Sequence, residues 1–162
     1  MKLYGELIST IGSILEIYER GCKSYKKSMK VGILRYVCQF VAMLLLGGIN
    51  GAIVAVMAII RSIFMYRKKF TTKVMILWIG ASVVIHSYFA TSLVDFVPLL
   101  ATIQFSIMAR GQTAKSLKTA QVVNTAIWIV YHASYHAYVY MANSIILLIV
   151  GVVRLIKGTK DD

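Results

Sequence analysis

The sequence predicts an all-α protein that crosses a membrane several times, a polytopic helical bundle. Of its 162 residues, 59% are hydrophobic and 15% are charged, whereas about 25% are charged in a typical soluble domain. The charged residues are also clustered, so that residues 36–60, 74–94 and 119–153 include no Asp, Glu, Lys or Arg. An α-helix rises about 1.5 Å per residue and a bilayer core is about 30 Å thick, so about 20 apolar residues cross it once. Each stretch is therefore long enough to cross.

The N-terminal segment leaves two alternatives open. Residues 4–18 are apolar, but the segment is short and contains Glu6 and Glu16, so it could cross the membrane or lie in the interface as an amphipathic helix. A signal peptide is disfavoured, because a glutamate follows the first lysine and no small-residue cleavage pattern closes the segment. If the segment crosses, it is the first of seven spans.

Residues 36–60 are better interpreted as a hairpin of two spans than as one span. Clusters of basic residues lie on both sides of this stretch, at 20–30 and at 67–73. Short basic loops stay in the cytoplasm, and a single crossing would place one of the two clusters outside. A turn at residues 47–51 (GGING), where glycine tolerates positive φ, keeps both clusters inside.

The same argument divides the two remaining stretches. Residues 74–109 turn near 91–95, and residues 119–153 turn at their most polar point, 132–136. The seven spans predicted in this way lie roughly at residues 3–19, 31–47, 50–66, 73–90, 93–109, 117–132 and 137–155. This topology places the N-terminus outside and the C-terminus in the cytoplasm.

The strong positive charge follows from this topology. The chain carries 18 Lys and Arg against 6 Asp and Glu, a net charge of +12, and every basic residue except Lys2 falls at or near the cytoplasmic face. The positive-inside rule and attraction to anionic lipid headgroups account for this distribution. A nucleic-acid partner is not needed, because the intervening spans prevent the basic residues from forming one soluble surface.

The chain also contains a weak internal repeat. Residues 38–43 align with 123–128, and the turn 47–51 aligns with 132–136. Spans one to three then overlay spans five to seven, which predicts two parallel three-helix bundles joined by a single span, a 3+1+3 arrangement. The parts of this single membrane domain are 1–67 for the first bundle, 68–91 for the linking span, 92–156 for the second bundle and 157–162 for a cytoplasmic tail. The alternative is that any seven-span protein with short loops can be overlaid in this way.

Five segments of the chain resemble a known family. These are 39–52 (QFVAMLLLGGINGA), 60–62 (IRS), 97–101 (VPLLA), 128–131 (WIVY) and 151–154 (GVVR). They are similar to the bacterial inner-membrane proteins of the YgjV family, which is distantly similar to the three-helix-bundle carriers that include the SWEET (PQ-loop) sugar transporters. The resemblance implies a multi-pass protein of the bacterial inner membrane that carries a small solute through a site between two bundles. The carriers have prolines as hinges in several spans, whereas this chain has Pro98 alone, which argues against a SWEET-like rocking movement.

The resemblance and the repeat indicate candidate solute-binding residues. In the carriers an asparagine of the third helix of a bundle and a nearby tryptophan contact the solute, which implies these roles for Asn143 and Trp128. Gln39 and Asn124 overlay each other in the repeat, and amides in hydrocarbon must find partners or line a cavity. Gln104 could join this pair. The alternative for all of them is structural, with interhelical hydrogen bonds for the amides and ordinary packing for the tryptophan.

Three histidines, His86, His132 and His136, are expected toward the outer face with Asp95 near them, and they are candidates for a proton-sensing or outer-gate role. His132 and His136 have the i, i+4 spacing that suits a metal ion on one helix. The predicted turn separates them, however, so no metal site is assigned. The alternative is an aromatic belt in which histidines lie among interfacial tyrosines.

Charged residues inside the predicted spans have structural explanations. Arg35 and Arg61 lie about one turn inside their spans, where snorkelling to the cytoplasmic headgroups explains them. Glu16 is expected near the end of its span, and proton coupling through it is the alternative. Asp95 and Pro98 suit the start of span five, since a carboxylate and a proline both favour the first turn of a helix.

The sequence favours a carrier over an enzyme. It has no nucleophile with a base and an orienting partner, no Gly-rich phosphate loop and no metal motif, so neither catalytic residues nor a cofactor are predicted. The leading hypothesis is a passive or proton-linked carrier of a small polar solute. The competing hypothesis is a membrane protein with a structural or partner-binding role. The two differ in whether Gln39, Asn124 and Asn143 converge on one cavity.

Overall fold

A computed structural model describes residues 2–47, 49–90, 92–136 and 138–160. These residues form α1 (Lys2–Gly21), α2 (Tyr25–Leu46), α3 (Ile49–Tyr66), α4 (Thr72–Phe89), a short 3-10 helix η1 (Leu93–Phe96), α5 (Val97–Ala109), α6 (Ala114–Ser134) and α7 (Tyr138–Ile156). Within these ranges there is no strand, and the one isolated bridge joins Ser24 to Lys160. The prediction of an all-α protein is confirmed.

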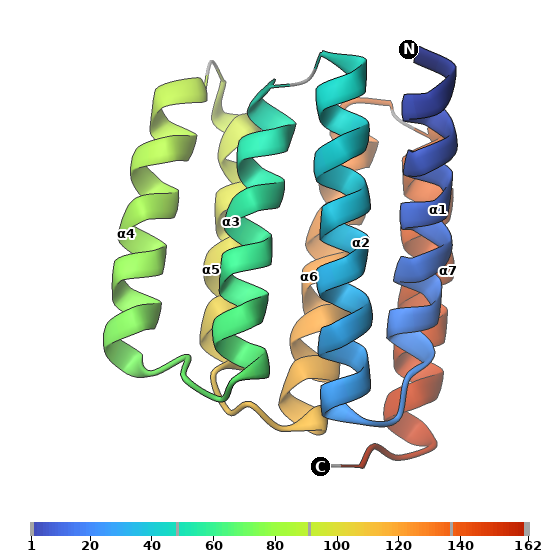
Figure 1. The fold of residues 1–162 in the computed structure, drawn as a ribbon, viewed down its shortest axis with the longest axis vertical. Helices are drawn as coiled ribbons and strands as arrows, with labels where there is room; N and C mark the ends of the chain where they lie inside the picture. The colour runs from blue at the N-terminus through green and yellow to red at the C-terminus, as the bar shows by residue number, and fades with distance from the viewer. Residues whose placement is uncertain (1, 48, 91, 137, 161–162) are drawn as a thin grey trace.

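The helices run up and down in two rows (Figure 1). In the first row α2 packs between α1 and α3, and in the second row α6 packs between α5 and α7. Helix α7 closes against α1, and α4, which links the two rows, packs on α5. Each triplet is therefore a flat row with its second helix in the middle. The helices of the first row, α4 and the helices of the second row fall within the residue ranges predicted for the first bundle, the linking span and the second bundle. The 3+1+3 arrangement of membrane spans and the internal repeat stay predictions.

The helices extend beyond the charge-free stretches, so the turns are shorter than predicted. Helix α2 begins after Ser24, whose hydroxyl accepts from Lys27 N at 3.1 Å, and it ends at Gly47, which has a φ of 80°. Helix α3 then begins at Ile49, so the turn is shorter than the predicted range 47–51 and ends before residue 49. Gly48 lies outside the described residues. Thr91 of the predicted turn 91–95 also lies outside them.

The start of the fifth span agrees with the sequence. Asp95 accepts from Ser92 N at 2.8 Å at the head of η1, and Pro98 lies in the first turn of α5. Both residues act at a helix start, as predicted. The predicted turn 132–136 differs, because α6 continues to Ser134.

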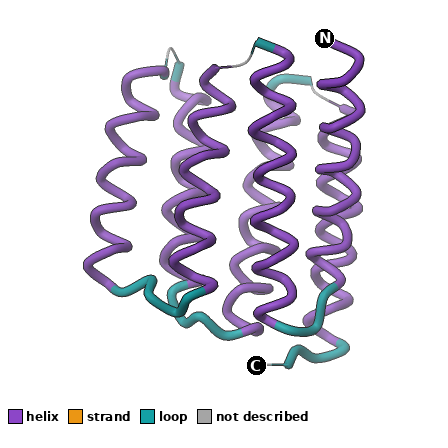
Figure 2. Tube along the Cα trace, viewed as in Figure 1, coloured by secondary structure: helices purple, strands orange, loops and turns teal. Residues whose placement is uncertain are grey.

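The two ends of the bundle differ in charge. The loops at residues 22–24, 67–71 and 110–113 and the tail 157–160 lie at the end that carries the C-terminus. The turns near residues 47, 90 and 135–136 lie at the end that carries the N-terminus (Figures 1 and 2). Apart from Lys2, the lysines and arginines all fall in the half nearer the C-terminal end. We call this end the basic end.

The large buried side chains gather at the basic end. Tyr25, Met65, Phe70 and Leu117 are all fully buried in one hydrophobic cluster, and the Tyr25 hydroxyl donates to Met65 O at 2.9 Å. Toward the opposite end the buried residues are mainly small, and they include Ala42, Ala52, Ala55, Ala58 and Ala101. The large residues of the hydrophobic core are therefore concentrated at the basic end.

The outer surface of the bundle is apolar. Exposed large hydrophobic residues occur on every helix, and they include Tyr4, Leu34, Ile60, Leu77, Val84, Leu100, Val130 and Ile149. Soluble proteins rarely expose continuous apolar surface on this scale. By length and composition, α2 and α4 qualify as membrane spans among the described residues, and 52–66, 93–109 and 140–156 are shorter apolar helices. The seven-span topology stays a prediction.

Candidate functional site

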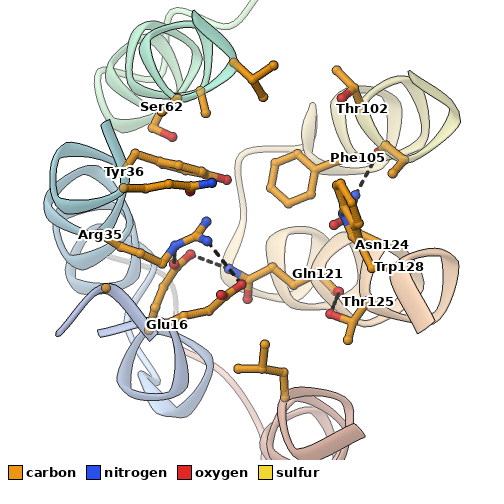
Figure 3. A pocket seen from close by; sticks show the side chains of 18 of the residues that line it. Glu16, Arg35, Tyr36, Ser62, Thr102, Phe105, Gln121, Asn124, Thr125 and Trp128 are labelled. Atoms are coloured by element: carbon orange, nitrogen blue, oxygen red, sulfur yellow. Dashed lines mark hydrogen bonds and ion pairs between the residues drawn. The ribbon is translucent and has the colours of Figure 1, made fainter. Parts of the chain in front are cut away.

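A cavity of about 390 Å³ lies between the two rows of helices (Figure 3). All seven α-helices contribute to its wall, α4 through Trp78, Ser82 and His86. On α1 the lining residues run from Ser9 to Arg20, so the cavity extends about 16 Å along the bundle at 1.5 Å per residue. A space of this size accommodates a small organic molecule.

The four candidate solute-binding residues all line this cavity: Gln39 from α2, Asn124 and Trp128 from α6, and Asn143 from α7. Asn124 also has a structural partner, since its Nδ2 donates to Ala101 O of α5 at 2.8 Å. Gln104 does not belong to the lining residues that are described. Its Nε2 donates to Ala120 O at 3.3 Å, so it links α5 to α6 instead of joining the other amides.

The three histidines separate. His86 and His132 line the cavity, at the end opposite the basic end. The His132 ring stacks on Trp128 and on Tyr140, with centroid distances of 5.6 Å in both cases. His136 follows the end of α6, has a φ of 53° and is exposed. The two histidines with i, i+4 spacing are therefore not on one helix. This agrees with the prediction that a turn separates them.

An ionic cluster that the sequence analysis missed forms the wall nearer the basic end. Arg35 Nη1 lies 3.1 Å from Glu16 Oε1, and Arg35 Nε lies 3.1 Å from Glu19 Oε2. Arg20 contacts the same Glu16 oxygen at 3.3 Å, and Gln121 Nε2 donates to Glu19 Oε1 at 2.6 Å. Figure 3 shows Glu16, Arg35 and Gln121 converging from α1, α2 and α6.

The prediction that Arg35 snorkels to the headgroups is wrong. Its side chain is 13% exposed and holds two carboxylates of α1 inside the bundle. Its guanidinium also lies over the Tyr36 ring, 3.9 Å from the centroid. The residue turns inward because its face of α2 meets α1, where Glu16 and Glu19 offer an opposite charge.

Lys118 is likewise not at the membrane surface. It is 1% exposed, and its ammonium donates to Glu19 O at 2.6 Å and to Ser28 Oγ at 3.0 Å. The Lys118 side chain thus joins α6 to α1 and α2, next to the ionic cluster. The sequence analysis counted it among the basic residues of the inner face.

Arg61 of α3 also lies inside, so the snorkelling explanation is wrong for it too. It is 7% exposed and lines the cavity. Its guanidinium carbon lies 4.4 Å from the centroid of Phe105 on α5, and it shares a side-chain hydrogen bond with Tyr36. The ion pairs formed by described residues involve Glu16, Glu19, Arg20 and Arg35, and Arg61 belongs to none of them.

One sequence signal could have indicated the cluster. Glu16, Glu19 and Arg20 are spaced at i, i+3 and i+4, so they share one face of a helix. Gly32 of α2 leaves room for this face, because a Cβ at Gly32 would lie 3.1 Å from Glu19 Cδ. A polar face opposite a glycine indicates a close contact between two helices. It does not indicate charged residues that lie separately at a membrane surface.

The apolar outer surface, the charged end and the buried polar cavity define a helical membrane protein. The model of the Imp-YgjV family, described as a bacterial inner membrane protein, matches residues 3–159. The chain belongs to this family, and the resemblance stated from the sequence is confirmed. No curated protein and no solved structure matches the chain.

Proposed function

We propose that this protein carries a small polar solute across the bacterial inner membrane, and that the solute site is the cavity between the two rows. The observation that supports this most is the composition of the cavity wall, in which Gln39, Asn124, Trp128 and Asn143 lie beside an ionic cluster. Polar and charged residues inside a membrane are costly, and they mark solute pathways when they face a cavity. A protein with a purely structural role has no need of such a wall.

The distribution of bulky residues supports a conformation that is open away from the basic end. The hydrophobic cluster around Tyr25 and Phe70 is fully buried at the basic end, whereas the cavity residues toward the other end, His86, His132 and Tyr140, are partly or largely exposed. The positive-inside rule favours a cytoplasmic location for the basic end. The cavity then faces outward, and transport requires a second conformation in which the cluster opens.

Movement of the two rows against each other would provide that second conformation. The closest packing between the rows is that of α1 on α7, and α4 packs mainly on α5. Alternating access in carriers is largely a rigid movement of one repeat against another around a fixed site. The single Pro98, near the start of α5, supports motion between rows in preference to bending within several helices.

Thiol labelling tests the proposal. In a Cys22→Ser, Cys38→Ser background, single cysteines at Ala58, Trp128 and Asn143 are treated with a membrane-impermeant thiol reagent added from outside. We expect all three to react, because each lines the cavity. The matched control is Val84→Cys, which is exposed on the outer apolar face of α4, where lipid excludes the reagent.

Two results would contradict the proposal. A lack of reaction at the three cavity positions, with reaction confined to the end turns, would mean a dry bundle and would favour the structural or partner-binding role. Purified protein in liposomes that moved no candidate solute, although its cavity reacted, would exclude transport.

A further inference from the structure

The polar atoms that lack hydrogen-bond partners in the cavity wall are mainly donors. Leaving aside the ion-paired atoms of Arg35 and Glu19, they are Arg20 Nε and Nη1, Arg61 Nε, Trp78 Nε1 and the acceptor Gln121 Oε1. Buried donors nearly always have partners in folded proteins. A cavity with a surplus of buried N–H groups is suited to a ligand that is rich in acceptors.

The charges of the wall point the same way. Two carboxylates, Glu16 and Glu19, face three guanidinium groups, those of Arg20, Arg35 and Arg61. Both carboxylates are already paired with Arg20 or Arg35. The positive charge that remains is that of Arg61, 7% exposed and without a carboxylate partner in the described part of the chain.

The surroundings of Arg61 fix its orientation without neutralising it. The Phe105 ring supports the plane of the guanidinium, a cation–π contact that holds the group while leaving N–H groups at its edge available. Ser62, 4% exposed, lines the cavity next to it in sequence. Tyr36 shares one side-chain hydrogen bond with Arg61, and Arg61 Nε is left without a partner among the described residues. A charged N–H group of this kind can donate to an oxygen of a carboxylate or phosphate group.

We propose that the cavity binds a small oxyanion, a carboxylate or phosphate group, and that Arg61 is its main ligand with the Trp78 indole N–H as a second donor. This inference rests on the proposed function and narrows its solute to an anion. A buried cation inside a membrane is costly when unpaired, and an anionic solute removes that cost on binding. The same chemistry could be supplied by a soluble metabolite or by the phosphate of a lipid headgroup.

The test measures the thermal unfolding midpoint of the delipidated full-length protein in a neutral detergent. Sodium phosphate and sodium succinate are titrated at constant ionic strength, and dioleoyl phosphatidylglycerol is titrated separately. We expect a saturable rise with at least one of the soluble anions. Arg61→Gln should weaken the apparent affinity by about 10- to 100-fold, since it removes a charged hydrogen bond. Arg67→Gln, an exposed arginine that follows the same helix, is the matched control and should change nothing.

A second variant keeps the proposal testable if Arg61→Gln does not fold. Trp78→Phe removes only the indole N–H and should weaken binding of the same anion. The unfolding midpoint could rise with phosphatidylglycerol alone, and Arg61→Gln could abolish that rise. This result would support the oxyanion site and assign it to a lipid headgroup, and it would contradict the transport of a soluble anion through this site. The site is refuted if neither ligand raises the midpoint, or if Arg61→Gln responds like the unmodified chain. Arg61-independent uptake of a neutral solute would leave the transport proposal intact and overturn this one.

Discussion

Arg35 holds two buried carboxylates from one neighbouring helix, and this makes it the central charge of the ionic cluster. Removing one member of a buried pair leaves the other charge unpaired, which costs more than the pair contributes. Arg35→Met would leave both Glu16 and Glu19 without this partner. We expect the free energy of unfolding to fall by about 3–5 kcal/mol, measured by SDS-induced unfolding in detergent micelles.

The control for Arg35→Met is Arg67→Met. Arg67 is exposed, and surface substitutions change stability by about 0.5 kcal/mol or less. If the two variants lost the same stability, the ionic cluster would not contribute to the fold.

Cys22 offers a pH-dependent test outside the helices. It lies in the loop between α1 and α2 and is 6% exposed. Burial raises the pKa of its thiol, so at any pH near the ordinary thiol pKa a smaller fraction is thiolate, the form that reacts. In a Cys38→Ser background we expect the alkylation rate of Cys22 to be low and to keep rising with pH after an ordinary thiol has levelled off.

The matched control is Lys23→Cys in a Cys22→Ser, Cys38→Ser background, because position 23 is exposed and adjacent. Its rate should be higher and should level off at lower pH. Identical pH profiles for the two thiols would contradict the burial of Cys22.

The sequence indicated the amides of the site more readily than its charges, and the reason is local. Gln39, Asn124 and Asn143 are conspicuous, because each is a polar residue within a long apolar run. Arg61 and Lys118 lie near the basic end of their helices, and Arg35 lies near the start of its predicted span. At these positions snorkelling and burial fit the hydropathy pattern equally well. Which of the two occurs, snorkelling or burial, depends on how each helix is rotated about its axis relative to its neighbours. A hydropathy pattern does not give this rotation.

At the scale of elements, helix caps locate the helix ends better than hydropathy does. Hydropathy marks only the part of a helix that can lie in lipid, so the predicted spans began late at α2 and α6. Helix α2 begins at Tyr25 and α6 at Ala114, in both cases directly after a capping residue, Ser24 or Thr113. A side chain that accepts from the first turn fixes the start of the helix wherever the membrane begins.

The contact between α1 and α2 depends on a glycine that faces the ionic cluster. A Cβ at Gly32 would lie 3.1 Å from both Cδ and Oε1 of Glu19, and that carboxylate is held by Arg35 and Gln121. Gly32→Ala should therefore displace Glu19 or separate the helices, with a loss of about 1–3 kcal/mol of stability. The measurement is the same SDS-induced unfolding.

Gly80 provides the comparison within a helix. It lies inside α4, and a Cβ there would meet nothing within 4 Å. Gly80→Ala should stabilise the protein by about 0.5–1 kcal/mol, because alanine loses less conformational entropy in a helix. If Gly32→Ala were equally stabilising, the close contact at α1 and α2 would be excluded.

At the scale of the whole molecule, the arrangement of α1 bears on the alternative that the sequence left open. Helix α1 packs along α2 and α7 as a member of the first row (Figure 1). A helix that lay flat in the interface would cross its neighbours at a steep angle instead. The packing of α1 therefore favours crossing. It also explains why two glutamates tolerate the interior, since Glu16 and Glu19 meet Arg35 there.

The topology then predicts which positions can be labelled in intact cells. In a Cys22→Ser, Cys38→Ser background, Leu3→Cys and Leu93→Cys should react with an impermeant thiol reagent added from outside, because both are exposed at the end opposite the basic end. Lys69→Cys, exposed in a loop of the basic end, should react only after permeabilisation, since short basic loops stay in the cytoplasm. Reaction at Leu93 without reaction at Leu3 would mean that α1 does not cross. Reaction at Lys69→Cys alone in intact cells would mean that the protein has the opposite orientation in the membrane. The cavity would then open toward the cytoplasm.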